Sequence, residues 1–169
     1  MRISFDLDDT LICYQPGSLY EPGRVPWWLR WCVYEPLRLG AAGLLRELAA
    51  AGHDLWVYTT SYRHPRTVSW WLRCYGTRAG GVINQDRHER RFGRRGRSKN
   101  PARFGIDLHV DDSWGVWLEN RGETNVCVVS PDDAGWVVRV RDAVSRVSKN
   151  EPPAPPPDLP AEYRHLAPG

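Results

Sequence analysis

Short apolar runs alternate with amphipathic segments along most of the chain. The apolar runs predict five strands, over residues 2–6, 54–59, 81–84, 106–110 and 124–129. The segments between them predict helices over 41–51, 65–75 and 114–120, a helix that starts at 130–133 and ends near 147, and one helical turn over 101–105. This alternation is typical of an α/β fold, a Rossmann-like doubly wound parallel sheet of about five strands.

Three segments do not follow the alternation. Residues 12–40 are rich in proline and glycine and are predicted to be irregular, apart from a short aromatic helix that carries three tryptophans: Trp27, Trp28 and Trp31. Residues 85–99 are polar and strongly basic, which predicts a loop or a small insertion. From Glu151 onward, seven prolines in 19 residues predict an extended tail outside the core. We therefore expect one domain over residues 1–149 and a Pro-rich tail over 150–169.

Composition limits the class of protein. The 169 residues are 41% hydrophobic, enough to bury a core, and the net charge of +3 is mild. The chain has 21 arginines but 2 lysines, with abundant alanine, glycine and proline, which favours a GC-rich bacterial coding genome over a functional cause. No signal peptide is visible, and no apolar stretch reaches the roughly 18 residues of a membrane span. The scattered cysteines predict reduced thiols in a cytoplasmic protein: Cys13, Cys32, Cys74 and Cys127.

Two carboxylates, Asp6 and Asp8, stand at the end of the first predicted strand. Residues at this spacing lie on the same face of a strand, so both side chains point into the crevice where α/β sheets bind ligands. Like charges repel, and a core does not hold two of them without a cation or a shared proton. The pair therefore predicts a functional site.

Further polar clusters follow the other predicted strands: Thr59-Thr60-Ser61, then Lys99, then Asp111-Asp112. Because the carboxyl ends of parallel strands share one edge of a sheet, we expect these clusters to meet Asp6 and Asp8. Clustered acids suit Mg²⁺, which prefers oxygen ligands, and a lysine with a hydroxyl suits phosphate oxygens.

In order and spacing, these stretches resemble the four motifs of the haloacid dehalogenase (HAD) superfamily: Asp6-Leu7-Asp8-Asp9-Thr10, Thr59, Lys99 and Asp111-Asp112. The likeness covers residues 2–112, about two thirds of the chain. The resemblance implies that Asp6 attacks phosphorus and forms an aspartyl-phosphate, while Asp8 protonates the leaving oxygen and then activates water. The presence of Asp8 favours phosphate over carbon–halogen chemistry.

The resemblance also implies the ligands of the site. Mg²⁺ would be held by Asp6, the main-chain carbonyl of Asp8 and Asp111, with Asp112 in or beside the coordination shell. Thr59 and Lys99 would hold the phosphoryl oxygens. The hydroxyl assignment rests on the strand register and could shift by one residue. The candidate substrate-binding residues are Thr60, Arg63 and Arg97, with surface placement as the alternative for Arg63.

One position departs from the family pattern and others remain open. Asp9 stands where glycine is frequent in the family. Residues 87–103 hold seven arginines and Lys99 against a single acid, and form either a solvated loop or a positive rim for an anionic substrate. The three tryptophans either form a flap over the crevice or pack against the core or a partner chain, and His109 is expected in the core.

The spacing of the motifs leaves no room for a full cap domain. The chain therefore resembles a capless or minimally capped HAD phosphatase, and an open site in that family goes with large substrates, such as protein or nucleic acid ends, or with oligomerisation. The expected function is Mg²⁺-dependent hydrolysis of a phosphate monoester. The alternatives are a nucleotide phosphatase or phosphotransferase on small molecules, and a non-catalytic module that binds phosphate or nucleic acid.

Overall fold

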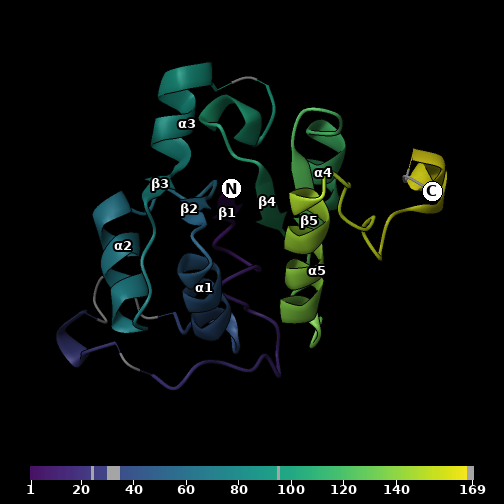
Figure 1. Ribbon diagram of the computed structural model, residues 1–169. Helices are drawn as coiled ribbons and strands as arrows, with labels where there is room; N and C mark the ends of the chain where they lie inside the picture. The colour runs from purple at the N-terminus through teal and green to yellow at the C-terminus, as the bar shows by residue number, and fades with distance from the viewer. Residues whose placement is uncertain (24, 30–34, 95, 167–169) are drawn as a thin grey trace.

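The computed structural model describes residues 1–166 apart from 24, 30–34 and 95. Its five strands form a parallel sheet in the order β3-β2-β1-β4-β5 (Figure 1). They are β1 (Arg2–Phe5), β2 (Asp54–Tyr58), β3 (Gly81–Ile83), β4 (Leu108–Asp111) and β5 (Asn125–Val128). The central strand β1 pairs with β2 and β4, and its last residue, Phe5, is in register with Val57 and Val110. The predicted parallel α/β sheet is confirmed.

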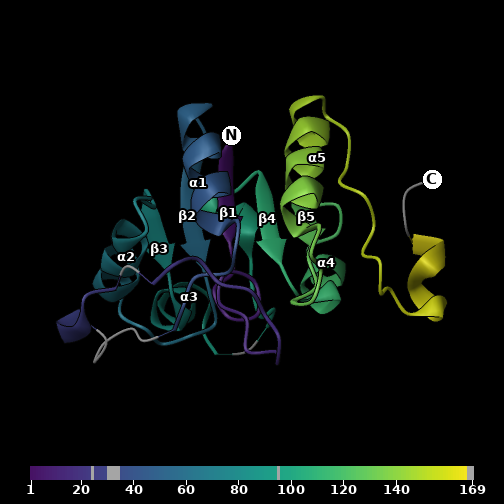
Figure 2. The same cartoon turned by 90° about the horizontal axis from the view of Figure 1, so that it is seen from below.

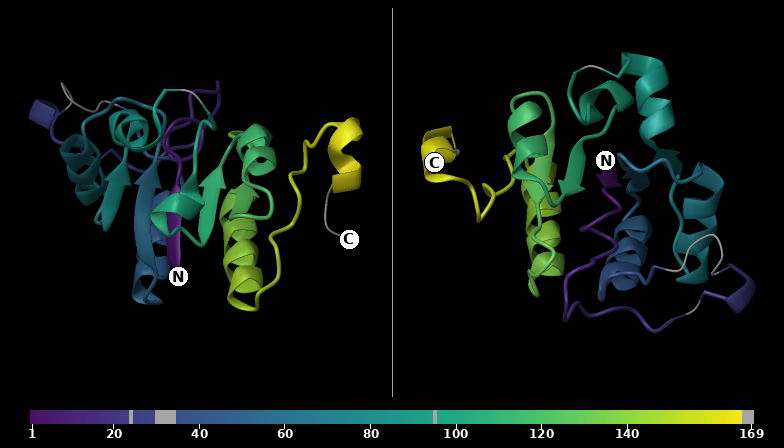
Figure 3. Two further views of the ribbon diagram at one scale, coloured as in Figure 1. Left: turned by 90° about the horizontal axis from the view of Figure 1, so that it is seen from above. Right: turned by 180° about the vertical axis from the view of Figure 1, so that it is seen from behind.

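Helices cover both faces of the sheet (Figure 2). On one face lie α1 (Ala41–Ala50), α2 (Pro65–Cys74) and α5 (Trp136–Ser148). On the other face lie α3 (Gln85–Phe92), the 3-10 helix η2 (Pro101–Phe104) and α4 (Trp114–Glu119). All strands point toward one end of the sheet, where the loops that follow β1 and β2 gather (Figure 3, left). The fold thus brings the residues after each strand to one edge.

The structure differs from the prediction in the basic segment 85–99, whose first half is the helix α3. The side chain of Asn84 caps this helix by accepting a hydrogen bond from the Arg87 backbone N–H (3.1 Å). His88 is the buried residue of α3, and its ring lies beside those of Tyr58 and Phe92. The sequence did not predict this helix, because only one histidine and one phenylalanine form its inner face and the other residues are polar.

Two elements begin at least two residues later than predicted. The fourth strand begins at Leu108. The Ile106 N–H donates to Pro101 O (3.2 Å) in the turn after η2, while the Asp107 N–H donates to Arg2 O (2.9 Å) on β1. The last helix begins at Trp136 and not at 130–133. The Asp133 carboxylate accepts a hydrogen bond from the Gly135 N–H (2.7 Å). This bond stabilises a turn just before the helix begins.

Part of the Pro-rich tail packs on the domain, so the prediction of a tail outside the core is wrong for this part. Leu159 is buried against Trp117 and Val126, and the Tyr163 ring lies 5.4 Å from that of Trp114. A short 3-10 helix, η3 (Ala161–Leu166), follows. Composition indicated no helix here, and the tail is held by apolar side chains between its prolines.

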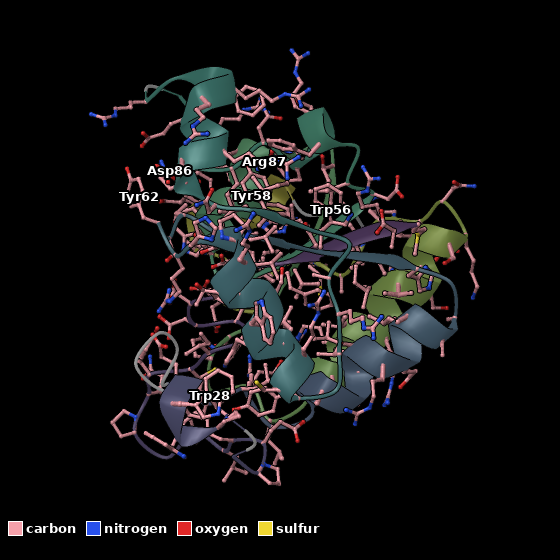
Figure 4. The ribbon with its side chains drawn as sticks, turned by 90° about the vertical axis from the view of Figure 1, so that its left-hand side faces the viewer. Trp28, Trp56, Tyr58, Tyr62, Asp86 and Arg87 are labelled. Atoms are coloured by element: carbon pink, nitrogen blue, oxygen red, sulfur yellow. The ribbon has the colours of Figure 1, made fainter. Side chains whose placement is uncertain are left out.

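The predicted aromatic helix exists as η1 (Trp27–Leu29). Trp27 and Trp28 are exposed (77% and 55%), so packing against this chain's core is wrong for both, and Trp31 lies outside the described residues. Trp28 is well separated from Tyr62, near the site described below, which does not favour a flap over that site (Figure 4). Three predicted free thiols are confirmed, and the fourth, Cys32, also lies outside the described residues. Within the described chain, no helix is long and apolar enough to cross a membrane.

Candidate functional site

The residues at the carboxyl ends of β1, β2 and β4 lie at the same edge of the sheet. Asp6 follows β1 and donates its backbone N–H to Val110 O (2.8 Å), which continues the pairing with β4. Thr59 follows β2, and its N–H donates to Ile83 O (2.9 Å). Asp111 is the last residue of β4. All three side chains are buried, as expected for residues that still belong to the edge of a sheet covered on both faces.

Lys99 joins two of these acids. Its Nζ lies 2.8 Å from Asp6 Oδ1 and 2.5 Å from Asp111 Oδ2, with all three side chains at most 8% exposed. The Lys99 backbone is fixed on both sides. The Asn120 side-chain amide donates to Lys99 O (3.3 Å), and the Tyr58 hydroxyl accepts a bond from the Asn100 N–H (2.8 Å). The lysine predicted from the sequence therefore lies at the centre of the site.

The ionisation of these groups follows from burial and charge. Burial raises the pKa of Asp6 to about 6, against the opposing effect of Lys99, and the charge of Asp111 adds to the rise. Burial and Asp111 likewise raise the pKa of Asp112 to about 6. Asp111 itself has a lowered pKa, because Lys99 and His109 outweigh the effect of its burial. Lys99 has a raised pKa, because the two acids outweigh its burial. The ammonium group thus stays charged.

Asp6, Asp111 and Asp112 could hold a metal ion. Each offers a carboxylate oxygen, and the three oxygens lie within 4.8 Å of one another. Three acids face one ammonium group, so the centre carries more negative charge than Lys99 neutralises. An all-oxygen, acidic donor set fits a hard divalent cation such as Mg²⁺.

The Asp8 carboxylate lies outside this group of three and faces Arg63. Arg63 Nη1 donates to Asp8 Oδ1 (2.9 Å), and the Tyr14 hydroxyl donates to the same oxygen (2.7 Å). Arg63 Nη2 lies 2.6 Å from Glu35 Oε1, whose side chain is 7% exposed. Arg63 Nη1 also donates to Ser61 Oγ (2.9 Å). Arg63, predicted to bind substrate, thus orients Asp8 and is itself held by a buried acid.

The residues after β2 have different environments. Thr59 is buried, and its hydroxyl accepts a hydrogen bond from the Ser61 N–H (3.0 Å). Thr60 is exposed and lines a pocket with Arg97. Arg97, also predicted to bind substrate, is paired with Glu123 (2.6 Å). Thr59 is the hydroxyl residue closest to the acids in the strand register, while Thr60 and Arg97 lie at the rim.

His109 belongs to the site as well as to the core. It is fully buried on β4, and its Nε2 lies 2.9 Å from Asp111 Oδ2, which it contacts as a donor. Its Nδ1 then accepts from Ser4 Oγ (2.8 Å). The sequence predicts His109 in the core but does not predict this contact. The available signal was its position two residues before Asp111, on the same face of the strand.

Asp9 has a local conformational role. Its φ of 56° lies in the left-handed region, which glycine adopts most readily and aspartate tolerates better than most residues. This conformation turns the chain after Asp8. It gives a physical reason why glycine suits the position and why an aspartate can replace it.

Comparison of the sequence with protein-family models gives no match, and comparison with curated proteins gives none either. The resemblance to the HAD superfamily therefore stays a prediction from the motif residues.

Proposed function

We propose that the chain is a Mg²⁺-dependent phosphatase of the HAD type, capless or minimally capped, that hydrolyses a phosphate monoester. The observation that carries this proposal is the buried bridge from Lys99 to Asp6 and Asp111 at the carboxyl edge of a parallel sheet. Such a bridge contributes little to the stability of a core, because removing each of the three charges from water costs several kcal/mol. A site for phosphoryl transfer needs these groups close together.

The reaction proceeds in two steps. An Asp6 carboxylate oxygen attacks phosphorus, the bond between phosphorus and the leaving oxygen breaks, and Asp8 gives that oxygen a proton. Water then attacks phosphorus and gives a proton to Asp8, and the bond to Asp6 breaks, which releases phosphate and restores both acids. Lys99 and Thr59 hold the phosphoryl oxygens throughout. Asp6, Asp111 and Asp112, with the Asp8 carbonyl, would hold Mg²⁺, which supplies charge neutralisation of the phosphoryl group.

The test is turnover of 4-nitrophenyl phosphate in the presence of Mg²⁺. Asp6→Asn should lower kcat by at least about 1,000-fold, because an amide cannot attack phosphorus. Asp9→Asn is the matched control. It makes the same chemical change three residues away, and asparagine also tolerates the left-handed conformation at φ 56°. It should retain activity.

The intermediate gives a second readout. Acid quenching during turnover of ³²P-labelled substrate should leave label on the wild-type chain and none on Asp6→Asn. Wild-type protein without turnover of any of several phosphate esters would overturn the proposal. Binding of phosphate esters without turnover, unchanged in Asp6→Asn, would instead indicate the non-catalytic binding module.

A further inference from the structure

We infer that the pocket beside Lys99 binds a second anionic group of the substrate, so that the preferred substrate is a phosphate monoester whose leaving group carries a further phosphate. This inference rests on the proposed function and adds the substrate class. Free nucleoside bisphosphates and the phosphorylated ends of oligonucleotides share this chemistry, and the experiment below separates them.

The pocket has a volume of about 290 Å³. Two of its residues are direct chain neighbours of site residues, since Thr60 follows Thr59 and Ser98 precedes Lys99. The remaining wall comes from α3 and the loop after it: Tyr62, Gln85, His88, Gly93, Arg94, Gly96 and Arg97. Tyr62 lies at this edge, next to Asp86 at the start of α3 (Figure 4). Direct chain neighbours of both residues proposed to hold the phosphoryl group thus line the pocket.

The charge of the pocket favours an anion. Among the described residues that line it, none is acidic and two are arginines. Arg94 is 84% exposed and pairs with Glu89 at 3.1 Å, while Arg97 pairs with Glu123 through side chains that are 37% and 46% exposed. The Glu89 side chain is 16% exposed, so only the Arg97–Glu123 pair is exposed on both sides. Pairs of that kind contribute roughly 0–1 kcal/mol, so a phosphate can replace Glu123 as the partner of Arg97 at little cost.

Hydrogen bonds on both sides fix the walls, which distinguishes the pocket from a solvated loop. Glu89 accepts bonds from the Tyr62 hydroxyl (2.8 Å) and the Gln85 amide (3.0 Å). The Tyr58 hydroxyl lies 2.5 Å from His88 Nδ1 below them. Across the opening, Ser98 donates from its backbone and its hydroxyl to Glu119 (3.1 and 2.9 Å). The residues on both sides of Arg94 and Arg97 are therefore held by hydrogen bonds.

The experiment compares kcat/KM for thymidine 3′,5′-bisphosphate with that for the two thymidine monophosphates, which differ from it by one phosphate. We expect a preference of about 10-fold or more for the bisphosphate, and a fall in that ratio with rising salt. The double variant Arg94→Gln/Arg97→Gln should lose most of the ratio. The matched control is Arg141→Gln, an exposed arginine paired with Glu47 on the opposite face of the sheet, which should keep it.

Equal kcat/KM values, or a preference that survives in the double variant, would overturn the inference. A short oligonucleotide with a terminal phosphate forms the third arm, and its preference over the bisphosphate would assign the nucleic acid source. Absence of turnover even with 4-nitrophenyl phosphate would defeat the proposed function alone. The dissociation constant of the bisphosphate, wild type against double variant, then decides whether the pocket binds anions.

Discussion

Arg63 Nη1 lies 2.9 Å from Oδ1 and 3.0 Å from Oδ2 of Asp8, so one nitrogen of the guanidinium contacts both oxygens of the carboxylate. The same arginine is held from behind by the buried Glu35 at 2.6 Å. The acid proposed to protonate the leaving group is thus oriented by a residue that follows β2. Arg63 acts through Asp8 and is a positioning residue.

Loss of this contact should matter most for poor leaving groups, which depend on proton donation. We expect Arg63→Gln to lower kcat about 10-fold for an alkyl phosphate and less than about 3-fold for 4-nitrophenyl phosphate, whose phenolate leaves without help. Arg63→Lys should recover part of the alkyl activity. The measurement is kcat for both esters in each variant.

Arg63→Gln also leaves Glu35 buried without its cation, which should destabilise the chain by about 2 kcal/mol. The double variant Glu35→Gln/Arg63→Gln removes that charge and serves as the stability control. An equal loss of kcat on both esters, restored in the double variant, would mean that Arg63 has only a structural role.

The acids of the centre should make stability fall as the pH rises. Burial raises the pKa of Asp6 and Asp112 from 3.8 to about 6, so the folded chain binds protons more tightly than the unfolded chain between these values. Stability is therefore lost as the pH rises through this window. Asp111 has the opposite sign, because its pKa is lowered, and its contribution is lost only as the pH falls below 3.8.

The proposed Mg²⁺ ion would compete with these protons and would bind only the folded chain. The rise in Tm on addition of Mg²⁺ should therefore grow between about pH 5 and about pH 7.5. Thermal unfolding with and without the ion at several pH values measures this. Asp112→Asn should flatten the pH dependence. A Mg²⁺ effect on Tm that is independent of pH, or absent, contradicts the proposed metal ligands.

His109 should tune metal binding through Asp111. Replacing it with leucine removes a buried donor to a candidate ligand, and partners of this kind affect metal affinity about 10-fold or more. We expect His109→Leu to raise the Mg²⁺ concentration for half-maximal activity by about 10-fold, and Ser4→Ala to have a smaller effect. His53→Gln, in the turn between α1 and β2, is the control. Unchanged Mg²⁺ dependence in His109→Leu would restrict this residue to a role in the core.

The tail should contribute to stability. Leu159→Ala removes a buried side chain from the cluster with Trp117 and Val126, at a cost of about 2 kcal/mol in the free energy of unfolding. Val138→Ala, at a side chain that is 66% exposed on α5, should change stability by less than about 0.5 kcal/mol. Urea denaturation measures both. Equal midpoints for the two variants would show that the tail is not held to the domain.

The sheet and the central part of the candidate site could be predicted from the residues in chain order. Apolar runs separated by amphipathic segments predict parallel strands, and parallel strands end at one edge. Asp6, Thr59 and Asp111 occupy the ends of three strands, so their convergence follows from chain order alone. Lys99 also lies at the centre as predicted, in the connection between β3 and β4.

The partners of these residues could not be predicted, because they depend on packing between distant segments. The contact between Arg63 and Asp8 spans 55 positions, and that between Ser4 and His109 spans 105. Periodicity reports which face of an element is buried, but not which side chain meets it there. The helix α3 and the packing of the tail were not predicted for the same reason. His88 and Leu159 pack against apolar side chains of other elements. Local pattern fixes elements and their order, whereas packing between distant segments selects the contacts that tune the chemistry.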